Sequence, residues 1–245
     1  MLGSTLLAKL LPDGVRGRWD HRRGHHQTFY PWGGPMNGQT ARLELCRQIL
    51  TQIGVSHIVE TGTYRGTTTE WLAQFGRPVV TFEADERYAR FSRLRLQKYP
   101  NVRLVHTNSV DGLRALLQEE HVRSGVVFYY LDAHWEDYLP LADELRIIAD
   151  QTPHAIVLID DFAVAGDPEY QFDDYGQRGA LNLDYLTSHG FGDLLCFFPT
   201  TPARAETGVA RGYVVATADH AIAASLQQLP HLRKHPAGSS TRSRA

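Results

Sequence analysis

The chain has 245 residues, with 25 Lys and Arg against 27 Asp and Glu, for a formal net charge of -2. A hydrophobic content of 42% beside 21% charged residues is typical of a globular protein and excludes a disordered chain. The near-neutral charge argues against electrostatic binding of nucleic acid, so we expect no nucleic-acid partner. We also expect no membrane contact, because no apolar run approaches the roughly 18 residues that a membrane-spanning helix needs.

The two cysteines, Cys46 and Cys196, can form neither a disulfide framework nor a cysteine metal site. They favour a reducing, cytoplasmic location.

Three regions are expected from composition. Residues 1–39 are rich in Gly, Pro and His and predict an irregular N-terminal arm, residues 40–230 predict one α/β domain, and residues 231–245 predict a flexible tail.

Within the central region, short β-branched segments alternate with amphipathic segments of helical spacing. This alternation predicts an open, mostly parallel α/β sheet with helices on both faces, in which ligands bind at the carboxyl ends of the strands. The expected strands are residues 57–60, 79–82, 102–106, 126–131 and 155–159. The expected helices are residues 40–53, 67–75, 86–98, 111–118 and 139–148.

A glycine-containing turn follows the first expected strand. Gly62 and Gly66 would let a ligand approach the backbone, and the next helix offers free N–H groups. A purely structural turn is an equal alternative. Thr63 and Tyr64 leave only a G-x-x-x-G spacing, which disfavours a nicotinamide cofactor.

Polar residues also follow the second and third strands. Glu83 lies about 20 residues beyond the glycine turn, where an acid can accept hydrogen bonds from both ribose hydroxyls. Its alternative is a solvated acid or a helix cap, a role for which Asp85 is also well placed. Asn108 and Ser109 could bind the edge of a purine or cap the next helix.

Three aspartates follow the fourth and fifth strands, namely Asp132 and the pair Asp160 and Asp161. Neighbouring strand ends lie about 5 Å apart, so these carboxylates can converge. Converging carboxylates repel one another unless a cation or proton intervenes, and oxygen ligands would select Mg²⁺, or else Mn²⁺ or Ca²⁺. Capping and other structural roles for the same aspartates are the alternative.

Together these residues resemble the class I S-adenosylmethionine-dependent methyltransferases, especially the cation-dependent O-methyltransferases of the macrocin type. The resemblance covers residues 40–218 and implies a Rossmann-like sheet of seven strands whose last two, expected at residues 193–198 and 212–218, are antiparallel. It implies S-adenosylmethionine and Mg²⁺ as cofactors. The implied cofactor-binding residues are Glu60, Gly62, Thr63, Gly66, Glu83, Asn108, Ser109 and Asp132, and the implied metal ligands are Asp132, Asp160 and Asp161.

The expected reaction is O-methylation of a small-molecule hydroxyl of the sugar or natural-product type. Asp132 and His134 are the candidate catalytic residues, with His134 as general base. The family commonly has Gly-Asp after its fourth-strand aspartate, whereas Ala133-His134-Trp135 follows here, which leaves the ligand set open. A metal-independent methyltransferase with His134 as the base, or a non-catalytic cofactor-binding subunit, is the alternative. The acidic and aromatic segment 163–180 is expected to cover the acceptor site, and a homo-oligomer is compatible with the sequence.

Overall fold

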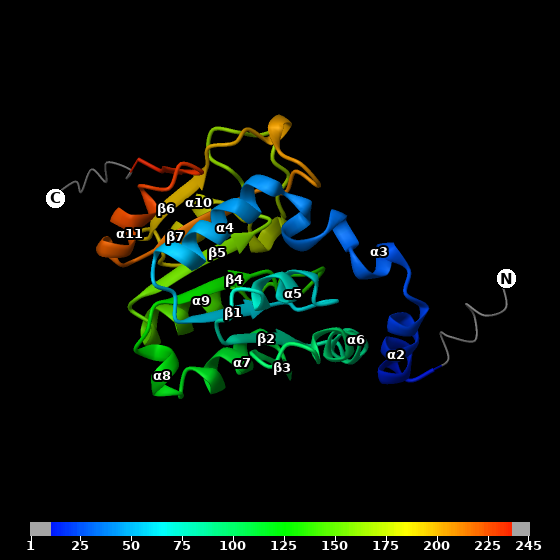
Figure 1. The fold of residues 1–245 in the computed structure, drawn as a ribbon. Helices are drawn as coiled ribbons and strands as arrows, with labels where there is room; N and C mark the ends of the chain where they lie inside the picture. Colours follow the sequence, from blue (N-terminus) through cyan, green and yellow to red (C-terminus); the bar gives the residue numbers. More distant parts are fainter. Residues whose placement is uncertain (1–10, 237–245) are drawn as a thin grey trace.

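The computed structural model describes residues 11–236 and contains one sheet in the strand order β3-β2-β1-β4-β5-β7-β6-β8 (Figure 1). Strands β1 to β5 pair in parallel, and β7, β6 and β8 add antiparallel pairs. The predicted Rossmann-like sheet is confirmed, with one strand more than the seven expected. The strands are β1 His57–Thr61, β2 Val79–Glu83, β3 Val102–His106, β4 Val127–Leu131, β5 Ala155–Asp160, β6 Leu195–Pro199, β7 Tyr213–Thr217 and β8 Leu232–Lys234.

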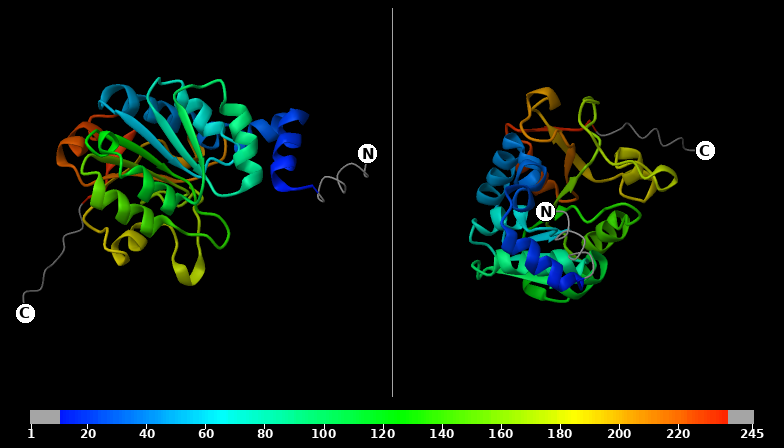
Figure 2. Two further views of the ribbon diagram at one scale, coloured as in Figure 1. Left: turned by 90° about the horizontal axis from the view of Figure 1, so that it is seen from below. Right: turned by 90° about the vertical axis from the view of Figure 1, so that its right-hand side faces the viewer.

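Helices cover both faces of the sheet, as predicted (Figure 2). The helices of the α/β region are α4 Thr40–Gln52, α5 Thr67–Ala73, α6 Glu86–Leu96, α7 Ser109–Leu116, α8 Glu120–Arg123, α9 Leu141–Gln151, α10 Leu183–Ser188 and α11 His220–Leu226. One apolar core contains residues of α7, α9 and α10, and the other contains residues of α4, α5 and α11. Within residues 11–236, no helix is long and apolar enough to cross a membrane.

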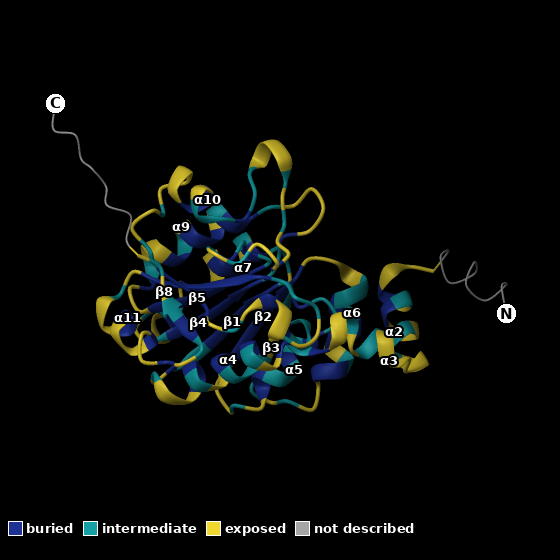
Figure 3. Ribbon diagram, turned by 90° about the horizontal axis from the view of Figure 1, so that it is seen from above, coloured by how far each residue is buried: buried dark blue, intermediate teal, exposed yellow. Residues whose placement is uncertain are grey.

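The burial of the central strand β4 on both faces explains why its sequence is apolar at every position. Val127 and Tyr129 enter the core under α7 and α9, while Phe128 and Tyr130 enter the core under α4 and α5. All five residues of β4 are buried. Both faces of a parallel strand need apolar side chains when helices cover both faces. The buried strands and the exposed outer surfaces of the helices are visible in Figure 3.

The N-terminal segment, expected to be irregular, contains helices at residues 13–23 and 26–29 and is irregular at residues 30–39, where Trp32, Met36 and Asn37 have positive φ. Helix α2 (Asp13–Arg23) packs on α6 and is followed by α3 (His26–Phe29) and two 3-10 turns, η1 (Pro31–Gly33) and η2 (Pro35–Gly38). Few apolar side chains mark α2, because glycine provides its packing surface: a Cβ at Gly17 would lie 2.2 Å from the carbonyl oxygen of Arg87. An ion pair of 2.6 Å between Arg87 and Asp20 joins the same two helices. Residues 1–10 of the expected arm lie outside the described part.

The first residues of the expected flexible tail form β8. Phe197, Phe198 and Pro199 of β6 pair with Leu232–Lys234, and Leu232 is buried against the core. Three residues are too few to show an alternating pattern, so the sequence did not reveal this strand. Residues 237–245 of the expected tail lie outside the described part.

Candidate functional site

The register of the sheet places the predicted site residues along one edge. Thr61 pairs with Leu131, and Leu131 pairs with Ile159. The residues that follow these three positions, Gly62, Asp132 and Asp160, therefore lie side by side at this edge. The site can be divided into a β1–β2 half and a β4–β5 half.

Gly62 is required by the close approach of β4. Its φ is +86°, and a Cβ there would lie 2.1 Å from the carbonyl oxygen of Asp132. The amides of Gly62 and Thr63 both donate to the carbonyl of Phe82 at 3.1 Å, which fixes the turn against β2. Gly66 has φ +71° and precedes α5. The sequence predicted that a ligand approaches this backbone, and the structure shows that the chain leaving β4 approaches it closely.

Glu83 links this turn to α6. Its carboxylate accepts hydrogen bonds from the amide of Tyr64 at 2.6 Å and from the amide of Asp85 at 2.8 Å. Burial raises the pKa of Glu83 to about 7, although these backbone N–H groups favour the charged form. The capping role belongs to Asp85, whose side chain accepts from the amides of Arg87 and Tyr88. Glu83 therefore does not cap α6. It lies at the end of β2 beside the glycine turn.

Glu60 lies within β1 and is 1% exposed. One carboxylate oxygen accepts hydrogen bonds from the hydroxyls of Thr69 and Thr81, the latter at 2.6 Å. Burial raises the pKa of Glu60 to about 7, against the lowering effect of the two hydroxyls. Thr63 also bonds to the Thr81 hydroxyl at 2.5 Å, so a small polar network underlies the turn.

The residues after β3 begin α7. Asn108 is its cap, because the Asn108 side-chain oxygen accepts from the amide of Asp111 at 2.9 Å. Ser109 is the first helical residue and is buried. Asn108 therefore caps the helix, which was one of the two alternatives for it. The side-chain amide nitrogen of Asn108 donates to the Asp111 carboxylate at 2.7 Å.

In the β4–β5 half, Asp132, His134 and Asp161 each offer one ligand atom, and these atoms lie within 4.8 Å of one another. His134 is 4% exposed, and within the described residues its Nε2 has no hydrogen-bond partner. That nitrogen is 3.8 Å from an oxygen of Asp161, which is too long for a direct hydrogen bond. The sequence predicted Asp160 as the third ligand, whereas the structure gathers His134 in its place.

The Asp160 carboxylate instead finds its hydrogen-bond and ion-pair partners on the face of the sheet that α4 covers. Its carboxylate forms a buried ion pair of 2.6 Å with Arg42 of α4, and it accepts hydrogen bonds from the hydroxyl of Tyr130 and from the amide of Asp161. Both carboxylate oxygens thus have protein donors. Asp161 adopts a φ of +52°, which turns the chain as it leaves β5. Two adjacent aspartates therefore serve opposite sides of the sheet, as expected for alternating residues at a strand end.

Arg211 holds Asp161 in the candidate ligand group. Its Nε donates to Asp161 at 2.5 Å, and the same guanidinium is hydrogen-bonded to Asp173. Burial alone would raise the pKa of Asp161, but His134 and Arg211 outweigh burial and lower it to about 2. Burial alone would lower the pKa of His134, but the negative charge of Asp161 and Asp173 raises it. For Asp132, burial and the charges of its neighbouring aspartates raise the pKa.

Sequence reasoning missed Arg42, Arg211 and Asp173. Arg42 lies within a predicted helix, on the face that carries Leu45 and Ile49, and Arg211 directly precedes an expected strand, so neither follows a parallel strand end. Asp173 belongs to the segment that was expected to cover the acceptor site, and Tyr175 of that segment donates to Asp173 at 3.1 Å. The sequence's only signal was the acidic and aromatic character of this segment.

No family model matches the chain. Among solved structures, it is similar to an O-methyltransferase from Bacillus cereus in complex with SAH, at 19% identity, a TM-score of 0.51, and coverage of 84% of this chain and 92% of that chain. The O-methyltransferase TomG from Streptomyces achromogenes, involved in tomaymycin synthesis and solved with SAM, gives 17% identity, a TM-score of 0.51, and coverage of 87% and 94%. The chain has the fold of the class I S-adenosylmethionine-dependent methyltransferases.

Curated relatives match a shorter stretch. Ribosomal RNA small subunit methyltransferase A from Thermotoga petrophila is 41% identical over 63 residues, which are 24% of this chain and 24% of that protein. The same protein from Thermotoga maritima is 49% identical over 47 residues, 19% of this chain and 17% of the relative. The matched stretch is thus about a quarter or less of the curated relatives' length.

Proposed function

We propose that the protein is an S-adenosylmethionine-dependent methyltransferase. The observation that carries the proposal is the hydrogen bond of 2.6 Å between the Glu83 carboxylate and the amide of Tyr64. It joins the glycine turn after β1 to the acid after β2 in one rigid unit. A nucleoside cofactor needs two features at this edge. One is a backbone that the ligand can approach, and the other is an acid that can accept hydrogen bonds from the ribose hydroxyls.

We propose further that the acceptor is a small-molecule hydroxyl and that a divalent cation assists. Two carboxylates and one imidazole fit such an ion, and the buried Nε2 of His134 without a hydrogen-bond partner is an atom that a metal would satisfy. This mixed donor set suits Mn²⁺, Fe²⁺ or Zn²⁺ as well as Mg²⁺. A bound ion would lower the pKa of the acceptor hydroxyl. Arg211 would keep the Asp161 carboxylate in place and charged.

The metal-independent alternative uses His134 alone as the base. The acidic neighbours of His134 raise its pKa, so a larger fraction of the imidazole carries a proton near pH 7 than for an ordinary histidine. A protonated imidazole cannot accept the acceptor's proton. The electrostatics of the site therefore favour the cation-assisted reaction over this alternative.

A small-molecule acceptor is preferred to nucleic acid on two grounds. The net charge of -2 gives the chain no overall attraction for a polyanion. After β4 the chain continues Asp132-Ala133-His134-Trp135, without the Asn/Asp-Pro-Pro-aromatic motif of enzymes that methylate the amino groups of bases.

The test combines binding and turnover in the full chain. Titration with S-adenosylhomocysteine should show one site, weakened at least tenfold by Glu83→Ala and unchanged in Glu120→Ala, which removes an exposed acid outside the site. Transfer of labelled methyl to a panel of sugar and phenolic hydroxyls should disappear with EDTA and return with a divalent metal. Absence of cofactor binding would overturn the proposal.

The other outcomes separate the alternatives. Turnover that EDTA leaves intact and His134→Ala abolishes would establish the metal-independent reaction. Cofactor binding without transfer to any acceptor would indicate a non-catalytic subunit. Loss of metal binding in Asp161→Asn, measured by calorimetry with Mn²⁺, is expected, while Asp173→Asn should weaken binding less because Asp173 acts through Arg211.

A further inference from the structure

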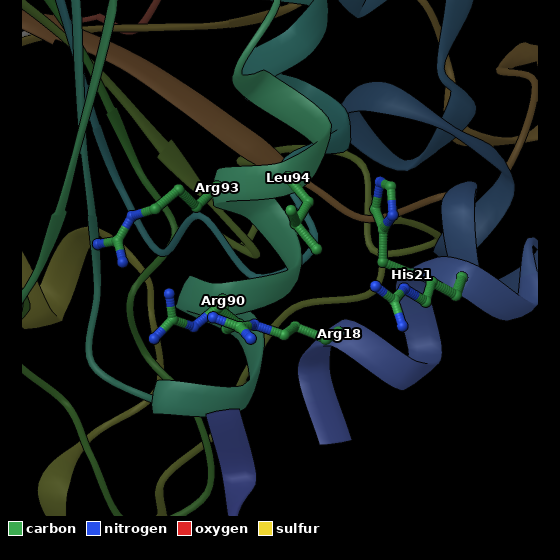
Figure 4. A pocket seen from close by; sticks show the side chains of 6 residues that line it. Arg18, His21, Arg90, Arg93 and Leu94 are labelled. Carbon is green, nitrogen blue, oxygen red and sulfur yellow. The ribbon is translucent and has the colours of Figure 1, made fainter. Parts of the chain in front are cut away.

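A cavity lies between α2 and α6, in a part of the molecule that the proposed reaction does not use. It has a volume of about 280 Å³. Figure 4 shows arginines of the two helices around it, with Arg18 extending from α2 toward Arg90 on α6. The lining residues are Arg18, His21, Arg22, Arg90, Arg93 and Leu94.

Other basic residues of these helices have acidic partners. Arg16 pairs with Asp13 at 2.8 Å, Arg87 with Asp20 at 2.6 Å, and Arg95 with Glu70 at 2.7 Å. The nearby acids Asp13, Asp20 and Glu70 are thereby neutralised. Glu86 of α6 is a further nearby acid, because its carboxylate and the Arg90 side chain both lie beside Gly14. Four arginines against this one acid leave the cavity with an excess of positive charge.

Among the described residues, the four cavity arginines have no such partners. Within residues 11–236, the side chains of Arg18, Arg22, Arg90 and Arg93 make no hydrogen bond or ion pair. The segments outside that range contain no acidic residue. We call Arg18, Arg22, Arg90 and Arg93 the arginine cluster.

The cluster cannot relax by separation of the two helices. Gly17 of α2 approaches the Arg87 carbonyl so closely that a Cβ there would lie 2.2 Å from its oxygen. His21 forms a wall of the cavity, with its ring 5.2 Å from the rings of both Phe29 and Phe91. The packing thus holds like charges around one cavity, an arrangement that an anion would stabilise.

We propose that the arginine cluster binds the phosphoryl or diphosphate group of a small molecule. Guanidinium groups match phosphate oxygens with paired N–H donors and keep their charge at any physiological pH. The cluster surrounds a single cavity of about 280 Å³, which suits a compact group bearing several charges. A nucleic-acid backbone would instead need a row of cations along the surface, and the chain as a whole is slightly acidic.

Inorganic pyrophosphate is the probe. Calorimetry on the full chain at constant ionic strength should show saturable binding at one site. The double variant Arg18→Gln/Arg90→Gln should weaken this binding at least tenfold. The matched control is Arg204→Gln, which removes an exposed arginine near β6 and should leave binding unchanged. Because Arg18 is exposed and Arg90 is half-buried, both variants should keep the circular dichroism spectrum and the S-adenosylhomocysteine affinity of the wild type.

Three results would overturn the proposal. The first is absence of saturable pyrophosphate binding, and the second is equal binding by the double variant and the wild type. The third is tighter, steeply salt-dependent binding of a mixed-sequence RNA oligonucleotide through the same arginines, which would assign the surface to nucleic acid. Since pyrophosphate binding is measured without methyl transfer, failure of this proposal leaves the proposed methyltransferase activity untouched.

Discussion

At the ends of β1 and β2, Glu60 and Glu83 accept hydrogen bonds from hydroxyl and backbone N–H groups, whereas Asp160 and Asp161 at the end of β5 face Arg42 and Arg211. The pKa values of the two glutamates rise to about 7, while that of Asp161 falls to about 2. Neutral donors do not offset the cost of burying a carboxylate, and a guanidinium does. One half of the site is therefore poor in charge and the other is built from ion pairs.

The largest expected effect is on the ion-paired half. Arg42→Met leaves the Asp160 carboxylate buried without its cation, and we expect unfolding to become easier by about 3–5 kcal/mol. Urea denaturation measures the change. Adding Asp160→Asn to the same chain should recover part of the loss, because the neutral amide is cheaper to bury. A loss below about 1 kcal/mol in Arg42→Met would show that the ion pair does not organise this half.

The next effect concerns the contact between the halves. Gly62→Ala places a Cβ against the carbonyl of Asp132 and should reduce the free energy of unfolding by about 3 kcal/mol, with loss of S-adenosylhomocysteine binding. Gly76→Ala is the matched control, because φ is +68° there and no atom lies within 4 Å of the added Cβ. It should cost only about 1 kcal/mol. Equal losses of stability in both variants would mean that the positive φ of Gly62, and not the approach of β4, is the reason for glycine there.

The charge-poor half should respond to pH in a defined direction. Folded Glu60 keeps its proton up to about pH 7, whereas the ordinary value is 4.5. Between these values the folded state binds more protons than the unfolded state, so stability should fall as pH rises, by about 2–3 kcal/mol from this residue. Glu60→Gln, which keeps an oxygen acceptor for Thr69 and Thr81, should remove that decline. Urea denaturation at pH 5 and pH 7.5 tests this, and an unchanged pH slope in the variant would contradict it.

The smallest effect concerns the attachment of the glycine turn to α6. Ser92→Ala removes a hydrogen bond of 2.6 Å to the carbonyl of Tyr64, which should cost about 1 kcal/mol and weaken S-adenosylhomocysteine binding about fivefold. Ser188→Ala removes a comparable side-chain to backbone bond of 3.1 Å in α10. That control should lose stability without losing cofactor affinity. Equal cofactor affinity in Ser92→Ala and the wild type would show that the turn needs no support from α6.

The same division explains what the sequence could predict. Strand β3 was predicted with its observed limits, and the glycine turn and Glu83 were found because turn residues and strand ends are local features. In the other half the sequence named Asp132 and Asp161 but wrongly added Asp160, because the role of Asp160 depends on Arg42, which is 118 residues away. Two adjacent aspartates point to opposite faces of a sheet, and the sequence alone does not show which face each one occupies. Helix α2 was missed because Gly14 and Gly17, and not an apolar stripe, form its contact surface.

Strand β8 has a consequence for association between chains. Without it, the margin of the sheet would be β6, which carries the buried residues Phe197 and Phe198 and unpaired backbone groups that another chain could join. The added strand is only three residues long and exposes Lys234, while the Arg233 guanidinium donates to the carbonyls of Pro199 and Ala165. Short, basic edge strands disfavour strand addition by a second molecule. We therefore expect this brief strand to disfavour edge-to-edge association on the antiparallel side of the sheet.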